Sequence, residues 1–279
     1  MSKRALFVHA HPDDETINNG ATMAQMVENG VVVTLITCTR GEEGEVLVPE
    51  LSHLASNAED KLGNHRVTEL ANAMKELGVK DHRFLGDYRD SGMMDTPPNQ
   101  NPDCFWRADV EAAAKKLAAI IDEIKPQVMV TYDENGGYGH PDHIQTHRVA
   151  MRAAEIASWQ IQKIYWNIMP KSVVQRGMDA MKAQGSDFFG AENVDELPFV
   201  KDDSFVSAVI HAPNQVEKKM AAMKAHATQI SLDGPFFALS NNLGVQVFGD
   251  EYYTLVKGEK AGPFNTDNLE TDLFAGIVI

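Results

Sequence analysis

The apolar positions near the start of the chain alternate between the patterns of buried strands and of an amphipathic helix. Residues 4–10 form a short apolar run that stops at Pro12, which is typical of a buried strand. Over residues 15–29 the apolar positions keep a helical spacing, and Gly30 follows as a C-terminal stop. Residues 31–38 form a second run that is dense in β-branched side chains. A strand, a helix and a strand in so short a stretch predict two parallel strands of one sheet.

The same alternation continues through the middle of the chain and becomes less regular after about residue 170. We expect further helices over residues 57–77, 109–124, 141–158, 171–184 and 214–225. We expect further strands over residues 82–85, 127–132, 163–168, 204–211 and 252–257. This order predicts an α/β fold, with a Rossmann-like, doubly wound and mainly parallel sheet and a less regular C-terminal portion. Because no repeat or linker-like stretch interrupts the chain, we expect a single domain over residues 1–279.

Composition excludes several classes of partner. The chain has 25 Lys and Arg against 40 Asp and Glu, a formal net charge of −15, which argues against nucleic acid and anionic membrane surfaces. No apolar run approaches the roughly 20 residues that span a bilayer, and the acids at 13–15 interrupt any signal-peptide core, so we expect a cytoplasmic protein. Two cysteines make no disulfide framework, and Cys38 is expected to be a small buried hydrophobe.

Histidines and carboxylates gather where two of the predicted strands end. The first strand leads into the segment HPDDE (11–15), and the strand over 127–132 leads through a glycine-rich turn into HPDH (140–143). In an open parallel sheet, ligands bind at the carboxyl ends of the strands. Catalytic zinc takes three protein ligands and leaves a fourth position open, and His11, Asp14 and His143 supply such a set. Asp13 is then free to take a proton from an attacking water.

Simpler and rival interpretations explain less of this pattern. Either segment alone could be a helix N-terminus whose acids cap free backbone N–H groups. Two such segments at two strand ends are much harder to explain by capping. A site built on His143 and His147 lacks the glutamate of the HExxH motif, since residue 144 is Ile, so His147 and His9 are expected to pack or to support the site. The sequence contains no GxSxG nucleophile motif and no phosphate-binding glycine motif.

These residues resemble the LmbE/PIG-L family of metal-dependent deacetylases, which remove acetyl groups from N-acetylglucosaminyl compounds. The resemblance rests on residues 10–15 and 140–143 and extends to four other segments, residues 39–45, 89–92, 135–139 and 225–229. Within the family the chain is most similar to the actinobacterial branch that deacetylates 1-D-myo-inosityl 2-acetamido-2-deoxy-α-D-glucopyranoside in mycothiol biosynthesis. The resemblance implies one deacetylase domain in which the part from about residue 170 completes the substrate pocket.

The resemblance also assigns the metal site and the base. His11, Asp14 and His143 would hold Zn²⁺, although the same ligands can hold Fe²⁺. Asp13 would be the general base. The expected partner is a small-molecule glycoside.

Five further residues receive roles from the same resemblance. His140 would act as the general acid or as an electrostatic stabiliser, oriented by Asp142, and Tyr138 would bind the substrate carbonyl or the oxyanion. Arg66 and Asp90 match positions that hold sugar or inositol hydroxyls. From the sequence alone, these last two indicate only solvated surface charges.

Two other functions remain open at this stage. A related branch, the mycothiol S-conjugate amidases, tends to carry lysine near position 18 and proline before the second histidine segment, where this chain has Asn18 and Gly139. The segment Ser-Asn-Asn at 240–242 and the acidic loop at 42–45 favour the biosynthetic branch. The other function is a non-catalytic metal-binding or sugar-binding protein, against which stand the presence of Asp13 and the open coordination position.

Overall fold

An eight-stranded sheet forms the centre of the protein in a computed structural model that describes residues 2–183, 185, 190–231 and 249–278. The strand order is β3-β2-β1-β4-β5-β8-β7, and β6 pairs with β5. The strands are β1 (Arg4–His9), β2 (Val32–Thr37), β3 (Asp81–Phe84), β4 (Val128–Thr131), β5 (Lys163–Pro170), β6 (Val200–Lys201), β7 (Ala208–His211) and β8 (Asp250–Lys257). Strands β1 to β6 pair in parallel, whereas β8 is antiparallel to β5 and β7.

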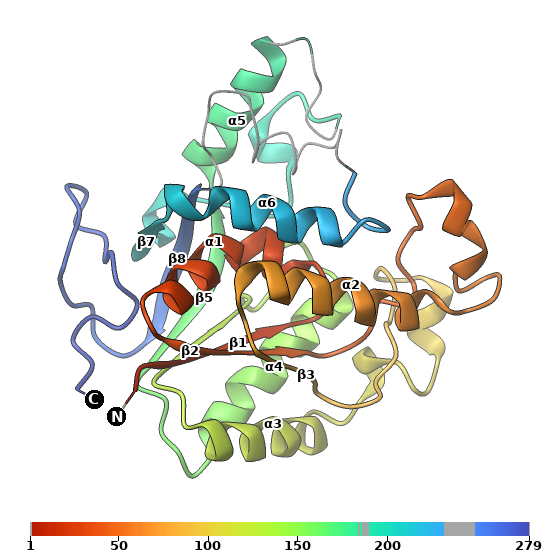
Figure 1. The fold of residues 1–279 in the computed structure, drawn as a ribbon, viewed down its shortest axis with the longest axis horizontal. Helices are drawn as coiled ribbons and strands as arrows, with labels where there is room; N and C mark the ends of the chain where they lie inside the picture. The colour runs from red at the N-terminus through yellow and green to blue at the C-terminus, as the bar shows by residue number, and fades with distance from the viewer. Residues whose placement is uncertain (1, 184, 186–189, 232–248, 279) are drawn as a thin grey trace.

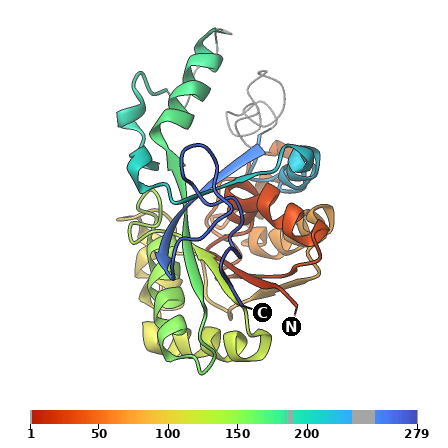
Figure 2. The same cartoon turned by 90° about the vertical axis from the view of Figure 1, so that its left-hand side faces the viewer.

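Helices cover both faces of the sheet (Figure 1). Helices α1 (Asp14–Glu28), α2 (Leu62–Leu77) and α6 (Val216–Ala225) pack together on one face, and α3 (Val110–Ile124) pairs with α4 (Pro141–Ile156) on the other. Helix α5 (Lys171–Ala183) extends away from this body, as Figure 2 also shows. Short 3-10 helices lie at Pro49–Leu54, Pro97–Gln100, Phe105–Arg107, Val194–Glu196, Asp203–Phe205 and Pro213–Gln215. Within the described ranges, no helix is long and apolar enough to cross a membrane.

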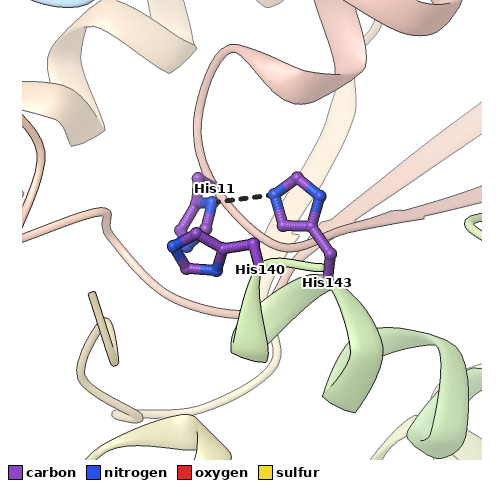
Figure 3. A group of neighbouring side chains, drawn as sticks. All are labelled: His11, His140 and His143. Atoms are coloured by element: carbon purple, nitrogen blue, oxygen red, sulfur yellow. Dashed lines mark hydrogen bonds between the residues drawn. The ribbon is translucent and has the colours of Figure 1, made fainter. Parts of the chain in front are cut away.

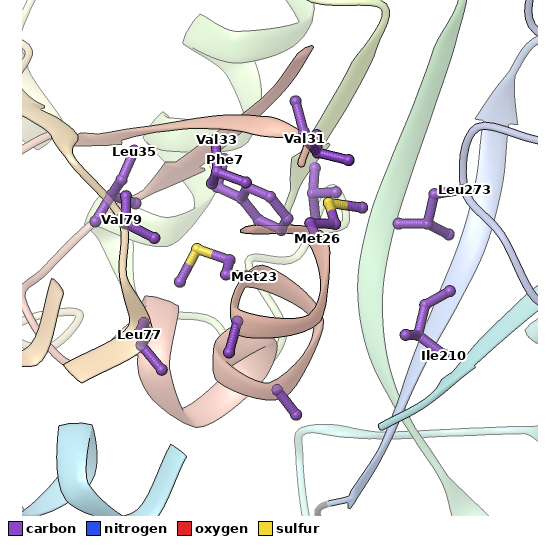
Figure 4. Close-up of a cluster of buried hydrophobic side chains, with 14 of the residues drawn as sticks. Phe7, Met23, Met26, Val31, Val33, Leu35, Leu77, Val79, Ile210 and Leu273 are labelled. Atoms are coloured by element: carbon purple, nitrogen blue, oxygen red, sulfur yellow. The ribbon is translucent and has the colours of Figure 1, made fainter. Parts of the chain in front are cut away.

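The first strand shows why its sequence is apolar without interruption. Ala5 and Phe7 belong to the buried cluster beneath α1 and α2, part of which Figure 4 shows. Leu6 and Val8 belong to the second cluster, beneath α3 and α4. Successive side chains of a strand point to opposite faces, and both faces of this sheet are covered by helices. Each of the four apolar positions from Ala5 to Val8 is therefore a core position.

The predicted mainly parallel α/β fold is confirmed, and the differences lie at element ends. The helix expected over 57–77 begins only at Leu62, because residues 55–60 form turns in which Asp60 takes a positive φ of 53°. The strand expected over 204–211 begins at Ala208, because Asp202 caps a short 3-10 helix just before it. The helix expected over 171–184 is observed to Ala183, and Gln184 lies outside the described residues.

The strand order reverses its direction beside β1. From β1 the chain moves outward through β2 to β3, and α3 then returns it to β4 on the other side of β1. At such a reversal the loops after the two central strands separate and leave room for a ligand. Both histidine segments follow these two strands.

Candidate active site

Three side chains from the two strand ends bring their donor atoms together, and Figure 3 shows the two histidines among them. His11 Nδ1 lies 3.4 Å from Asp14 Oδ2 and 3.3 Å from His143 Nε2, and these last two atoms lie 3.3 Å apart. All three residues are buried. With zinc–ligand bonds of about 2.0–2.1 Å, two tetrahedral ligands lie about 3.4 Å apart. This donor triangle therefore has the spacing of three ligands of a single tetrahedral ion.

The other ring nitrogens of the two histidines are held by acceptors. His143 Nδ1 lies 3.1 Å from the carbonyl oxygen of Gly136, and His11 Nε2 lies 3.2 Å from Asp142 Oδ2 and 3.5 Å from Asp90 Oδ1. Such acceptors keep the proton on the outer nitrogen and leave the inner one for a metal. Burial by itself would lower the pKa of His11, yet the surrounding carboxylates, Asp90 foremost, raise it well above its usual value. The cluster thus stabilises positive charge at this point.

The position of the Asp142 carboxylate corrects one prediction. It does not orient His140: it lies on His11 and accepts hydrogen bonds from the backbone N–H (2.9 Å) and the hydroxyl of Ser91. Instead, the backbone N–H of Asp142 donates to His140 Nδ1 at 3.1 Å. The reason is that His140 caps α4, so its ring accepts from the first turn while the next carboxylate turns toward β1. This role of Ser91 could not be predicted from the sequence, because its partner Asp142 is 51 residues away.

The His140 ring is a neutral hydrogen-bond donor. Burial, together with the nearby His11 and His143, lowers the pKa of His140 to about 2. Because Nδ1 accepts the N–H of Asp142, the single proton of the neutral ring sits on Nε2. Of the two roles suggested by resemblance, this protonation state favours the electrostatic stabiliser over the general acid.

Asp13 stands apart from the donor triangle in a strained conformation. Its backbone has φ 118° and ψ −35°, a region that costs a non-glycine residue about 1–3 kcal/mol. Its Oδ2 lies 3.2 Å from Arg66 Nη2. Burial raises the pKa of Asp13 to about 6, although the Arg66 charge opposes the rise. The carboxylate can therefore hold or release a proton near neutral pH, as a general base must.

Arg66 and Asp90 are not the surface charges that the sequence alone indicates. They are only 3% and 4% exposed, because the long loops after β2 and β3 fold over the strand ends and enclose them. Arg66 donates to the carbonyl oxygens of Gly41, at 2.8 Å, and Pro12. Asp90 faces His11. Both residues therefore contact the segment of residues 11–13 directly.

Comparison with known proteins identifies the family. Residues 6–154, more than half of the chain, match the family described as PIG-L: GlcNAc-PI de-N-acetylase. The chain belongs to the PIG-L family. A relative from Geodermatophilus obscurus, named 1D-myo-inositol 2-acetamido-2-deoxy-alpha-D-glucopyranoside deacetylase, is 55% identical over 292 residues, which cover 99% of this chain and 98% of the relative.

Solved structures share the fold of this PIG-L family member. The N,N'-diacetylchitobiose deacetylase from Pyrococcus horikoshii has a TM-score of 0.58 and 20% identity, over 92% of this chain and 85% of the other. The 4-carboxy-2-hydroxymuconate hydratase from Pseudomonas putida has a TM-score of 0.63 and 19% identity, over 94% of this chain and 100% of the other. Since one of these is named a hydratase, the fold by itself does not determine the reaction.

In this family member, the turn that carries Tyr138 is fastened from the C-terminal part of the chain. Tyr138 is 38% exposed, and its ring meets that of His143 edge-on at 5.0 Å between centroids. Asp133 organises the turn by accepting the N–H of Gly137 at 2.8 Å. Its other oxygen lies 2.7 Å from Lys201 Nζ, on β6. The part of the chain after residue 170 thus reaches the turn beside the donor triangle.

Tyr132 is a supporting residue that the sequence analysis missed. Its ring stacks on His143 at 4.4 Å between centroids, and its hydroxyl accepts the N–H of Ala10 at 3.0 Å. His9 and His147 contact Tyr132 at its hydroxyl and its carbonyl oxygen, which confirms that they support the site without joining the donor triangle. The available signal was an aromatic residue at the end of a central strand. Cys38 is fully buried, as predicted.

Gly136 offers a test of how closely the turn fits His143. A Cβ at Gly136, where φ is 61°, would lie 2.5 Å from His143 Cβ and 2.7 Å from Ile144 N. We expect Gly136→Ala to displace His143 and to weaken metal binding about 10–100-fold, as for loss of a ligand's support. Gly137→Ala is the matched control, because φ is 76° but a Cβ there meets nothing within 4 Å. Competition with a chelator measures both affinities, and equal weakening in the two variants would assign the effect to backbone strain.

Proposed function

We propose that this protein is a zinc-dependent hydrolase that removes the acetyl group from 1-D-myo-inosityl 2-acetamido-2-deoxy-α-D-glucopyranoside in mycothiol biosynthesis. The observation that carries the proposal is the donor triangle beside Asp13, in a chain 55% identical to a full-length relative named for this deacetylation. The products are acetate and the free amine of the glucosaminyl-inositol. The same three donors could hold Fe²⁺, so metal identity is a separate question for the purified protein.

In the proposed reaction, Asp13 carries the proton, and His140 and Tyr138 donate hydrogen bonds. A zinc ion held by His11, Asp14 and His143 would polarise the acetamide carbonyl and lower the pKa of water. Asp13 takes the proton from the attacking water as the carbon–oxygen bond forms. The carbonyl oxygen becomes an oxyanion, to which the Nε2–H of His140 and the hydroxyl of Tyr138 donate.

Collapse of this intermediate completes the hydrolysis. The carbon–nitrogen bond breaks, and Asp13 delivers its proton to the departing amine. Burial raises the pKa of Tyr138, so its hydroxyl stays protonated and remains a donor at neutral pH. No protein side chain other than Asp13 has to gain or lose a proton during these steps.

The pKa of Asp13 predicts the acidic side of the pH profile. The base works only as a carboxylate, and its pKa of about 6 means that it becomes protonated as pH falls through that value. A bound dication would lower this pKa, so we expect kcat/KM to decline with a midpoint at or below about pH 6. Rates measured from pH 4.5 to 8 on metal-loaded protein check this. A midpoint above pH 7 would require another group to be the base.

The turn before His140 bears on the choice between the two branches. Gly139 has φ 93°, and proline is restricted to φ near −65°. A branch with proline at this position must shape the turn differently. This observation supports the deacetylase over the S-conjugate amidase. The segment 240–242, which also favours the deacetylase in the sequence, lies outside the described residues.

The deciding experiment compares two substrates on purified protein of known metal content. We expect kcat/KM for the acetylated glucosaminyl-inositol to exceed that for a mycothiol S-conjugate. The opposite ratio would make the chain an amidase. Bound metal with hydrolysis of neither compound would favour the non-catalytic binding protein.

A further inference from the structure

Residues 225–229 are part of the family resemblance, but the reaction above does not use them. His226 is fully buried, and its Nε2 lies 2.9 Å from Oε1 of Glu15, which is also fully buried. Thr228 donates to the two oxygens of Glu69 on α2, at 2.9 Å from its backbone N–H and 2.7 Å from its hydroxyl. Its carbonyl oxygen accepts the N–H of Leu47 at 2.9 Å. The segment is therefore anchored to α1, to α2 and to the acidic loop.

Glu15 connects this segment to the candidate base. While Oε1 faces His226, Oε2 accepts the backbone N–H of Asp13 at 2.9 Å. Asp13 is the residue with φ 118°, and a non-glycine residue keeps such a conformation only where its surroundings hold it. One buried carboxylate thus joins the strained backbone at the start of α1 to the end of α6.

Glu15 and His226 are paired inside the protein, where neither side chain reaches solvent. Nε2 of His226 and Oε1 of Glu15 lie 2.9 Å apart, at hydrogen-bond distance. Nδ1 of His226 has no hydrogen-bond partner among the described residues. Its contact with Glu15 is therefore the hydrogen bond that orients the ring.

We infer that Glu15 and His226 are positioning residues that hold Asp13 in its strained conformation. In this conformation the carboxylate of Asp13 stays outside the donor triangle, where it can accept a proton from the attacking water. Neither side chain needs to touch the substrate. His226 holds Glu15, and Glu15 holds the backbone N–H of Asp13; we call this pair of contacts the clamp. The inference rests on the proposed function only for the catalytic role of Asp13; the clamp itself is a property of the folded chain.

Two polar substitutions of His226 distinguish positioning from simple packing. Gln places its amide nitrogen near the position of Nε2 and can still donate to Glu15, whereas Asn places it near Nδ1 and cannot reach. We expect His226→Asn to lower kcat about 10²-fold, the effect of a small misplacement of a catalytic group, with KM and metal content nearly unchanged. His226→Gln should recover most of this loss. His211→Asn, in an exposed pair with Asp250, is the control and should keep the full rate.

A double-mutant cycle tests whether His226 acts through Asp13. In an Asp13→Ala background, His226→Asn should cause no further loss of kcat, because the group that it positions is gone. An equal loss in both backgrounds would overturn the inference. So would a full rate in His226→Asn alone, or equal rates for the Asn and Gln variants.

Hydrogen exchange supplies a readout that needs no turnover. In His226→Asn, the amides of residues 11–16 should exchange faster than in the unaltered protein, while His226→Gln and His211→Asn should match it. Unchanged exchange in His226→Asn would overturn the clamp even if the protein is an active deacetylase. Conversely, faster exchange in a chain that hydrolyses no N-acetylglucosaminide would leave the clamp standing and refute the proposed function.

Discussion

Asp13→Ala is expected to lower kcat by about 10²–10⁴-fold while the protein keeps its metal, since one general acid–base group contributes that much. The metal should stay because the carboxylate of Asp13 lies by Arg66, outside the donor triangle. Steady-state rates and the metal content of the same preparation measure the two effects together. The decline of the rate toward low pH should disappear along with most of the activity.

Asp13→Asn separates the proton from the shape of the side chain. The amide keeps the size of the carboxylate and can still face Arg66, but it cannot accept a proton from water. A loss as large as that of Asp13→Ala would assign the effect to proton transfer. Full activity in either variant would move the role of base to another residue, and loss of metal in both would place Asp13 among the ligands.

His11→Ala is expected to abolish metal binding and turnover together. It removes one corner of the donor triangle, and it also leaves the buried carboxylates of Asp90 and Asp142 facing each other without the ring between them. Added zinc should not restore the rate at concentrations that saturate the unaltered protein. Metal content after dialysis and the rate at increasing zinc measure this.

His147→Ala is the matched control for that experiment. This histidine is on α4, one turn after His143, but its Nδ1 lies 3.0 Å from the carbonyl oxygen of Tyr132 and takes no part in the triangle. The variant should keep its metal and most of its rate. If His147→Ala loses the metal and His11→Ala retains it, the donor triangle is wrong.

The proximity of His11, Asp14 and His143 could be predicted, because all three follow the ends of neighbouring parallel strands. His11 and Asp14 are three residues apart at the end of a strand, and the second histidine segment follows a strand that the topology places beside the first. Hydrophobic periodicity, which identified those strands, reports burial of consecutive residues. It contains nothing about side chains that meet from distant loops.

The contacts around the donor triangle could not be predicted, because they join side chains from loops that are far apart in the sequence. Arg66 is an ordinary charge in a helical pattern, and only the folded loops show that it is buried against Pro12 and Gly41. The direction of the Asp142 carboxylate depends on the cap of α4 and on Ser91. The contact of Glu15 with His226 joins residues 211 positions apart.

The direction of the last strand also could not be predicted from the sequence. Period and composition predict that residues 252–257 form a strand, but they do not say which neighbour it joins. In the structure β8 enters between β5 and β7 and runs antiparallel to both. A parallel connection needs a right-handed crossover, and in this portion of the chain the sequence pattern does not specify one.

The contact of Lys201 with Asp133 has a consequence for how relatives of this chain can diverge. All three donors and Asp13 lie within residues 6–154, the segment that matches the family, whereas Lys201 and His226 lie beyond it. The proposed donors and base thus lie in one stretch of the chain, and some of the residues that support them, Lys201 and His226, lie in another. Sequence change in the later stretch can alter the shape of the catalytic turn and the hold on the base while the metal ligands stay the same, so new specificities can arise without rebuilding the reaction.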